Sequence, residues 1–142
     1  MEKIEHINYI RVPAAVIYEA LTTQDGLGKV WTNKLIVKPQ LNFINEFDFD
    51  DNYGTKMKVV ELSEYKKIAW ECVESDPEWI GTGITFELEE KNNVTSVVLI
   101  HYGWRQLTEF YRWCNYNWAM FLLSLKNYCE KGKGEVYQER DF

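Results

Sequence analysis

The sequence contains few cysteines and few histidines, which argues against the common metal-bound and disulfide-bonded architectures. The three cysteines, Cys72, Cys114 and Cys129, are odd in number and widely spaced, so neither a disulfide framework nor a CxxC metal site is expected. We expect reduced, mostly buried thiols. The two histidines, His6 and His101, lie far apart, and no HExxH motif is present. The sequence therefore predicts no metal and no cofactor.

Long apolar runs are also missing. The first residues, MEKIEH, lack the apolar segment of a signal peptide, and no apolar run reaches the roughly 18 residues that a membrane helix needs. We therefore expect a cytoplasmic protein.

Positive charge is scarce, since 16 basic residues face 22 acidic ones and the net charge is −6. A field of that sign repels phosphate backbones and anionic lipid headgroups. Neither nucleic-acid binding nor membrane binding is expected. Sequence motifs for nucleotide binding and for a serine nucleophile are absent too. The segment 81–83 (GTG) lies inside a predicted strand without the Lys-Ser/Thr of a phosphate-binding loop, and no GxSxG motif occurs.

Aromatic residues, in contrast, are abundant. Six Trp, nine Tyr and seven Phe make up 15% of the 142 residues. Such side chains provide large buried areas and the walls of pockets, but they can equally fill an ordinary core. The length suits one domain spanning residues 1–142.

Hydrophobic periodicity predicts one strand, two short helices, six further strands and one long helix. Pro13 suits the start of the first helix, Thr23 and Thr108 suit N-caps, and Gly132 suits the end of the last helix. The expected strands are 3–12, 35–37, 45–50, 55–62, 67–74, 79–90 and 94–104, with helices at 14–21, 24–30 and 108–131 and turns at 51–54, 63–66, 75–78 and 91–93.

The last predicted helix has one continuous apolar face. Its members recur at steps of three and four residues: Leu107, Tyr111, Cys114, Trp118, Phe121, Leu122, Leu125 and Cys129. A rod of roughly 36 Å is long enough to cross a whole sheet. The polar tail 134–142 is either a strap or a frayed end.

These elements favour an α+β helix-grip fold, in which a curved seven-stranded antiparallel sheet wraps around the long C-terminal helix. Short turns between successive strands indicate an antiparallel meander. Because twisted sheets curl, a straight helix laid in the sheet leaves space at one end. That space is the predicted ligand cavity.

Several segments in order resemble the START/Bet-v-like (SRPBCC) superfamily, and in particular the branch named after the activator of the heat-shock chaperone ATPase. They are 10–22 (IRVPAAVIYEALT) with Trp31, 59–62 (VVEL), 78–82 (EWIGT), 95–104 (TSVVLIHYGW), 117–126 (NWAMFLLSLK) and 132–134 (GKG). The resemblance implies a helix-grip fold with a hydrophobic pocket for lipids, aromatics or polyketides. The chaperone-activating members are larger proteins with an additional N-terminal domain, so a chaperone partner is not expected here.

Strand parity and this resemblance together nominate the residues that line the cavity. On the strand 79–90, Ile80, Thr82, Ile84, Phe86 and Leu88 are expected to face inward; on 94–104 the resemblance favours Thr95, Val97, Leu99 and His101. The predicted ligand-binding residues are Trp31, Met57, Val59, Trp70, Trp79, Thr82, Ile84, Phe86, Leu99, His101, Tyr111, Trp118 and Phe121. The alternative is that most of them simply fill the core.

Glu61 and His101 are weak catalytic candidates, because an inward carboxylate facing a histidine could orient a ligand or move a proton. Three hypotheses follow. The first is binding of a hydrophobic or aromatic small molecule. The second is a cyclase, aromatase or dehydratase that uses these two residues. The third is a co-chaperone-like interaction module, and homodimerisation through exposed sheet edges is also open.

Overall fold

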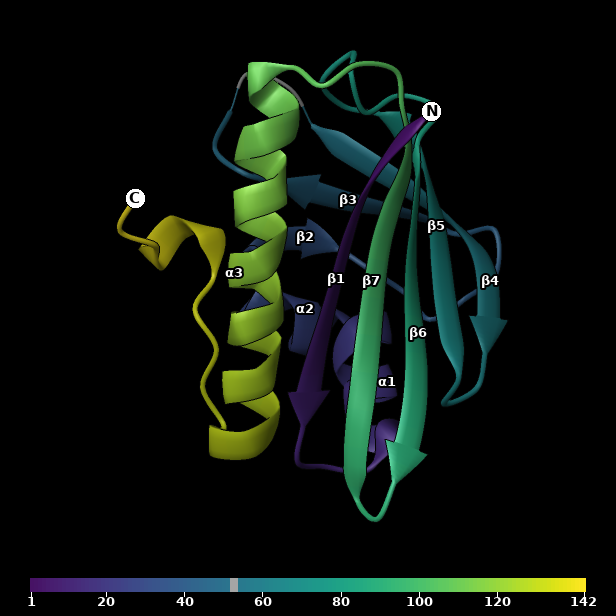
Figure 1. Cartoon of the computed structure of the whole chain (residues 1–142), viewed down its shortest axis with the longest axis vertical. Helices are drawn as coiled ribbons and strands as arrows, with labels where there is room; N and C mark the ends of the chain where they lie inside the picture. The colour runs from purple at the N-terminus through teal and green to yellow at the C-terminus, as the bar shows by residue number, and fades with distance from the viewer. Residues whose placement is uncertain (52–53) are drawn as a thin grey trace.

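Seven antiparallel strands form one sheet in the order β1-β7-β6-β5-β4-β3-β2, and a long helix runs along it (Figure 1). The computed structural model describes residues 1–51 and 54–142. The elements are β1 (Glu2–Ile10), α1 (Ala14–Thr22), α2 (Gln24–Val30), β2 (Lys34–Ile36), β3 (Ile44–Asp48), β4 (Thr55–Ser63), β5 (Lys67–Glu74), β6 (Gly83–Lys91), β7 (Val94–Trp104), α3 (Glu109–Lys131) and a 3-10 turn, η1 (Tyr137–Glu139). The predicted helix-grip fold is confirmed. The predicted turn at 51–54 includes residues 52 and 53, which lie outside the described residues.

The helix ends form where the sequence places their caps. Thr23 Oγ1 accepts a hydrogen bond from the N–H of Gly26 at 3.1 Å. Thr108 Oγ1 accepts one from the N–H of Tyr111 at 3.0 Å. Gly132 ends α3 in the left-handed conformation, with φ of 82°, which a residue without a Cβ adopts at little cost.

The start of β6 differs most from the prediction. β6 begins at Gly83 and not at residue 79, because residues 79–82 form a turn closed by a hydrogen bond from Thr82 N to Trp79 O at 2.9 Å. Gly81 occupies positive φ (85°) in this turn, and the strand alternation stops there. Ile80 is consequently 43% exposed, so its predicted place on the inward face is wrong.

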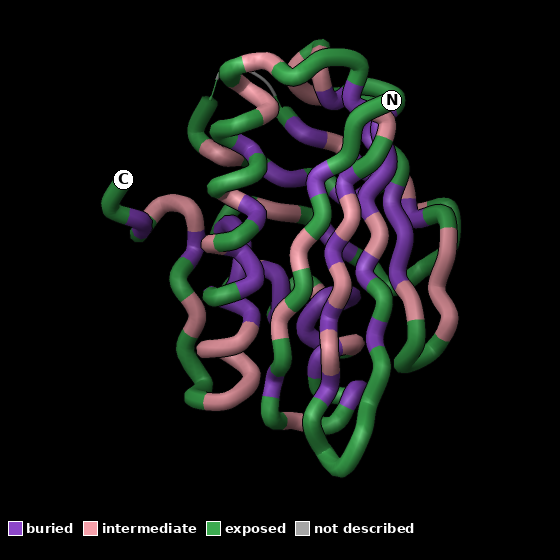
Figure 2. The backbone as a smooth tube through the Cα atoms, in the orientation of Figure 1, coloured by how far each residue is buried: buried purple, intermediate pink, exposed green. Residues whose placement is uncertain are grey.

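The remaining strand faces follow the predicted alternation. Figure 2 shows buried and exposed residues alternating along the strands. Apart from Glu61 on β4, the residues that alternation places inward on four strands are buried: Thr55, Met57 and Val59 on β4, Ile68, Trp70 and Cys72 on β5, Ile84, Phe86 and Leu88 on β6, and Thr95, Val97, Leu99 and His101 on β7.

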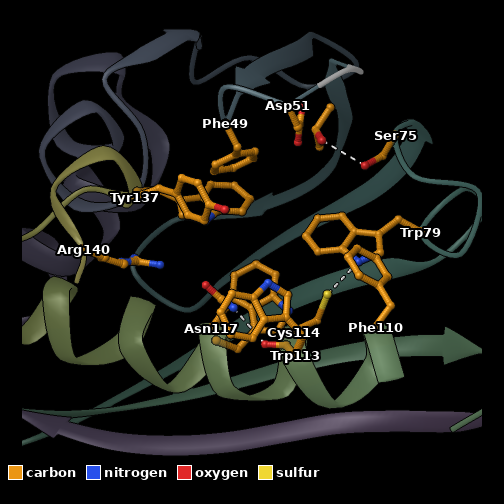
Figure 3. Close-up of a pocket in the computed structure, with 13 residues that line it drawn as sticks. Phe49, Asp51, Ser75, Trp79, Phe110, Trp113, Cys114, Asn117, Tyr137 and Arg140 are labelled. Atoms are coloured by element: carbon orange, nitrogen blue, oxygen red, sulfur yellow. Dashed lines mark hydrogen bonds between the residues drawn. The ribbon is translucent and has the colours of Figure 1, made fainter. Parts of the chain in front are cut away.

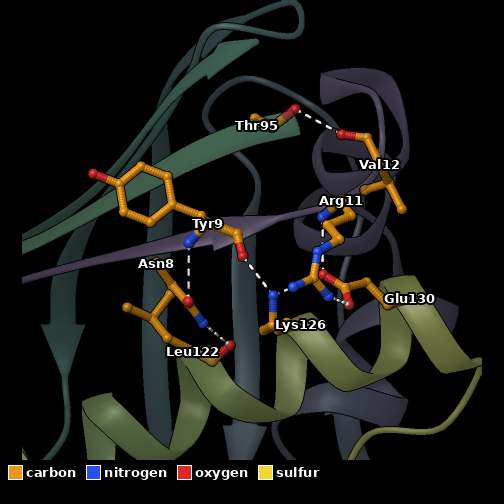
Figure 4. A network of polar contacts seen from close by, with 8 residues as sticks. All are labelled: Asn8, Tyr9, Arg11, Val12, Thr95, Leu122, Lys126 and Glu130. Atoms are coloured by element: carbon orange, nitrogen blue, oxygen red, sulfur yellow. Dashed lines mark hydrogen bonds and ion pairs between the residues drawn. The ribbon is translucent and has the colours of Figure 1, made fainter. Parts of the chain in front are cut away.

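Polar contacts fix α3 against the end of β1 (Figure 4). Lys126 Nζ donates to Tyr9 O at 2.6 Å and to Glu130 Oε2 at 2.8 Å. The same carboxylate accepts from the backbone N–H of Arg11 at 2.8 Å. The hydrogen bond from Lys126 and then the one from Arg11 lower the pKa of Glu130. These contacts set the position of the helix along the strand.

The tail after α3 is an ordered strap and not a frayed end. It runs back along α3 toward the middle of the helix (Figure 1). Ser124 Oγ accepts from Glu135 N at 2.8 Å and donates to Val30 O at 2.8 Å, and Tyr137 N donates to Trp31 O at 2.7 Å. Val136, a residue of the strap itself, is buried. The tail is therefore part of the folded domain.

Within the described part of the chain, no helix has both the length and the apolar character needed to cross a membrane.

Candidate functional site: an aromatic pocket closed by the C-terminal strap

The centre of the space between the sheet and α3 is filled by aromatic side chains. The rings of Trp31 and Trp70 stack with centroids 5.9 Å apart, and Trp70 meets Phe86 edge-on at 5.2 Å. Phe121 packs from α3 against Trp31 at 5.4 Å. Interlocked rings of this kind leave no room for a ligand at the middle of the helix. These contacts favour the alternative of a filled core for this region.

A pocket of about 170 Å³ remains at the N-terminal end of α3 (Figure 3). Segments far apart in the chain form its floor and sides, and most of the lining side chains are aromatic. The lining consists of Trp31, Phe49, Asp51, Thr55, Ser75, Trp79, Phe110, Trp113, Cys114, Asn117, Trp118, Tyr137 and Arg140. The predicted cavity at one end of the helix is present, but it is small.

Most of the lining residues come from α3, from the end of α2, from the turn before β6 and from the strap. One helical face of α3 supplies five lining residues between 110 and 118, which recur at steps of three and four residues. Trp31 follows the last turn of α2, and Trp79 lies in the turn before β6. The strap supplies Tyr137, whose ring lies 5.5 Å from that of Phe49 and 5.5 Å from that of Phe142. The pocket is thus closed by the last residues of the chain.

Two polar pairs on the lining are satisfied internally. Thr55 Oγ1 and Ser75 Oγ lie 2.9 Å apart. Trp79 Nε1 donates to Cys114 Sγ at 3.3 Å. Burial raises the pKa of the Cys114 thiol to about 12, so the thiolate that a nucleophile requires is scarce at neutral pH.

Two other lining residues carry buried polar atoms without any partner. Arg140 is 8% exposed, and neither its Nε nor its Nη2 makes a hydrogen bond. Burial lowers the pKa of this guanidinium, which nevertheless remains a cation. Asn117 donates from Nδ2 to Trp113 O at 2.8 Å, whereas its Oδ1 is buried and unpaired. Native proteins rarely leave such atoms unsatisfied, so each one points to a missing partner.

His101 lies outside the pocket, in a closed chain of hydrogen bonds. Its Nδ1 accepts from Trp118 Nε1 at 3.0 Å, and its Nε2 lies 2.8 Å from Thr82 Oγ1. The Thr82 hydroxyl donates to Trp79 O at 2.6 Å. Because that hydroxyl has only one proton, His101 must donate from Nε2 and is the neutral tautomer. Burial lowers the pKa of His101 to about 3, which suits a structural role.

Glu61 does not face inward, and it does not meet His101. A β-bulge between Val59 and Glu61 breaks the alternation of β4. The carboxylate accepts from Ser63 Oγ at 2.9 Å and lies 3.5 Å from Lys67 Nζ, with a side chain that is 42% exposed. Two strands separate β4 from β7, a spacing of roughly 14 Å. The predicted acid–base pair is therefore wrong.

Of the thirteen predicted ligand-binding residues, the pocket brings together Trp31, Trp79 and Trp118. The others lie in the core or beside it and do not line the pocket: Met57, Val59, Trp70, Thr82, Ile84, Phe86, Leu99, His101, Tyr111 and Phe121. Tyr111 turns toward β1, where its hydroxyl donates to Lys3 O at 2.7 Å. Leu107, predicted on the buried face of the helix, is half exposed because it precedes the first turn of α3.

The polar tail left a strap and a frayed end open as alternatives, and no pattern pointed to Phe49 and Asp51, the lining residues that follow β3. The tail nevertheless contains Val136, Tyr137 and Phe142, which a solvated end does not need, and these residues were a sign that it packs against the domain.

A larger, open hollow of about 450 Å³ lies over β2, β3 and the start of β4. Its lining mixes the charged side chains of Lys34, Glu46, Asp48 and Lys56 with those of Leu35, Ile36 and Phe47, whereas small-molecule sites are mostly apolar. No cluster of metal-binding side chains occurs among residues 1–51 and 54–142.

Comparisons with known proteins agree with this fold. An Aha1 dimer from Colwellia psychrerythraea is 40% identical, with a TM-score of 0.88 over 94% of this chain and 100% of that one. The protein SSP2350 from Staphylococcus saprophyticus shares the fold at 17% identity (TM-score 0.78; 96% and 99% of the two chains). CalU16 from Micromonospora echinospora does so at 13% identity (TM-score 0.72; 90% and 74%).

No curated protein matches the sequence. The family described as "Activator of Hsp90 ATPase homolog 1-like protein" matches residues 11–130, which is most of the chain. The chain therefore belongs to this family, within the SRPBCC superfamily.

Proposed function

We propose that the protein binds a small aromatic molecule in the pocket at the N-terminal end of α3. The observation that carries this proposal is an aromatic-lined pocket of about 170 Å³ beside the packed aromatic core. Small-ligand sites are mostly apolar, with a few placed polar groups, and this lining has that composition.

The volume limits the size of the ligand. An apolar cavity of about 150 Å³ accepts benzene, whereas drug-sized ligands occupy pockets of about 300–1,000 Å³. A molecule of one or two rings fits the pocket as it stands. A long acyl chain or a polyketide would require the strap to move away.

The indole N–H signals of the tryptophans provide a direct test. Trp31, Trp79, Trp113 and Trp118 line the pocket, whereas Trp70 and Trp104 do not. We expect titration with indole, a neutral ring, to shift the first four signals in a nitrogen–proton correlation spectrum and to leave the other two in place. Equal shifts of all six signals, or none, would contradict the proposal.

A blocking variant sharpens this test. Ser75→Phe places a ring in the pocket from the wall opposite α3, and it should abolish the indole-induced shifts. Val73→Phe is the matched control, because Val73 is exposed on the neighbouring part of β5 and does not line the pocket. Retained binding in Ser75→Phe would place the ligand elsewhere.

The enzyme alternative loses its proposed residues, because Glu61 and His101 lie on separate strands and His101 is neutral and enclosed.

Dimerisation has a specific observation in its favour, since the relative from Colwellia psychrerythraea is described as a dimer. We propose that this chain also forms a dimer, with the side chains of Ile7 and Tyr9, which are exposed on β1, as candidate contacts. Light scattering coupled to gel filtration should give a mass near twice 16.9 kDa, and a monomer mass would refute it.

A further inference from the structure

We propose that the ligand of this pocket is an aromatic carboxylic acid whose carboxylate is held by Arg140. This inference rests on the proposed function and specifies the chemical class of the ligand. Two independent observations carry it: an unpaired buried guanidinium on the lining, and an unpaired buried amide oxygen near it.

The free nitrogens of Arg140 have the geometry of a carboxylate fork. Nε–H and one N–H of Nη2 lie on the same edge of the planar guanidinium and point in the same direction, as two parallel donors. Neither donor has a partner, although the residue is 92% buried, as its 8% exposure implies. Two carboxylate oxygens match this edge in a bidentate hydrogen bond, which is stronger than a bond between neutral groups.

The surroundings of Arg140 leave the Nε–Nη2 edge of its guanidinium without a hydrogen-bond partner. Glu135 and Tyr137 are the groups that act on Arg140 electrostatically, and neither makes a hydrogen bond to its free edge. Asp51, the acidic residue among the described lining residues, lies across the pocket from Arg140 (Figure 3). The guanidinium extends from the strap toward the aromatic walls in the same view. Buried N–H donors without acceptors are unfavourable, so a bound carboxylate would satisfy this edge.

Asn117 adds a second recognition element. Its Nδ2 donates to the carbonyl oxygen of Trp113, which fixes the orientation of the amide and leaves Oδ1 as the free end. This oxygen accepts a hydrogen bond, so it suits a hydroxyl or an N–H on the ligand ring. The walls between these groups are aromatic, and the volume of about 170 Å³ accommodates a single ring with small substituents. A hydroxylated benzoic acid combines all of these features.

The test compares an acid with its neutral isostere. We expect 4-hydroxybenzoate to bind the wild-type protein about tenfold or more tightly than 4-hydroxybenzamide, as measured by calorimetry or by the tryptophan N–H shifts. Arg140→Gln should reduce this ratio to about one, and Arg140→Lys, which keeps the charge but not the fork, should give an intermediate ratio. Lys133→Gln removes one positive charge from an exposed position of the same tail and should keep the full preference.

The outcomes separate this inference from the proposed function. If indole binds but the acid is no tighter than the amide, the carboxylate assignment is wrong and the aromatic pocket stands. If neither indole nor the acid binds, both proposals fail. Inorganic phosphate that competes as strongly as 4-hydroxybenzoate would indicate a general anion site and would overturn the aromatic-acid assignment. Asn117→Leu tests the second element, since it should remove the preference for 4-hydroxybenzoate over benzoate.

Discussion

Trp118 Nε1 donates a hydrogen bond to His101 Nδ1 at 3.0 Å, and this bond joins the long helix to strand β7. The imidazole continues the chain through Thr82 to the carbonyl of Trp79, so each polar atom in this buried row is satisfied. The row lies directly beside the pocket, because Trp79 and Trp118 also line it. His101 therefore positions two pocket walls without touching the ligand space.

The first prediction is that stability falls in mild acid because His101 must take up a proton on unfolding. Burial lowers its pKa in the folded state to about 3, whereas an unfolded histidine titrates near pH 6.5. Below about pH 6.5 the unfolded state binds one more proton, so the free energy of unfolding decreases as the pH falls toward 3. The full loss approaches roughly 5 kcal/mol. Urea unfolding between pH 7 and pH 4.5 should show about 2.7 kcal/mol of this loss, and His101→Gln should flatten the slope. An unchanged slope in that variant would assign the effect to other groups.

The second prediction concerns Trp118→Phe, which keeps an aromatic ring but removes the indole N–H. His101 Nδ1 then becomes a buried acceptor without a donor, and we expect a loss of about 1–3 kcal/mol in the free energy of unfolding. Trp113→Phe is the control, since Trp113 is 42% exposed and should change stability by less than about 0.5 kcal/mol. Equal effects of the two substitutions would show that the hydrogen bond contributes little.

Thiol reactivity gives the third prediction. Burial raises the pKa of Cys72, Cys114 and Cys129 to about 12, so all three are protonated at pH 8. We expect each to react with an aromatic disulfide reagent at least about a hundredfold more slowly in the native protein than in guanidinium, where all three thiols become accessible. Rapid labelling of any one cysteine in the native state would contradict this burial.

The fourth prediction tests how closely the strap approaches the domain. A Cβ added at Gly134 would lie 2.6 Å from Lys29 O and 2.8 Å from Ser124 Oγ, so Gly134→Ala should destabilise the protein by about 1–3 kcal/mol. At Gly28 within α2 the nearest atom, Leu35 Cδ2, is 3.4 Å away. Gly28→Ala should be neutral or stabilising by up to about 1 kcal/mol, because alanine favours the helix. The free energies of unfolding of both variants, measured in guanidinium, test this difference.

Local features of the sequence predict the fold. Alternating residues on β6 and β7, threonines before the helices and Gly132 after the last one each specify an element or a boundary, and they agree with one another. A single antiparallel order then buries every apolar face. The architecture could therefore be predicted without coordinates.

The pocket could not be predicted in the same way, because an empty volume depends on the packing of side chains from distant segments. Alternation correctly placed Trp70 and Phe86 inward, but it could not tell that their rings interlock with Trp31 and leave no space. A one-residue bulge was enough to turn Glu61 toward solvent. Arg140 stands in a polar tail that has no periodic pattern, so its burial only becomes visible in three dimensions.

The strap contributes to the proposed site from outside the segment that the family model matches. That match ends at residue 130, whereas Tyr137 and Arg140 come after it. In the proposed site, the group that selects the acid would therefore come from a different segment than the sheet and helix residues that build most of the aromatic walls.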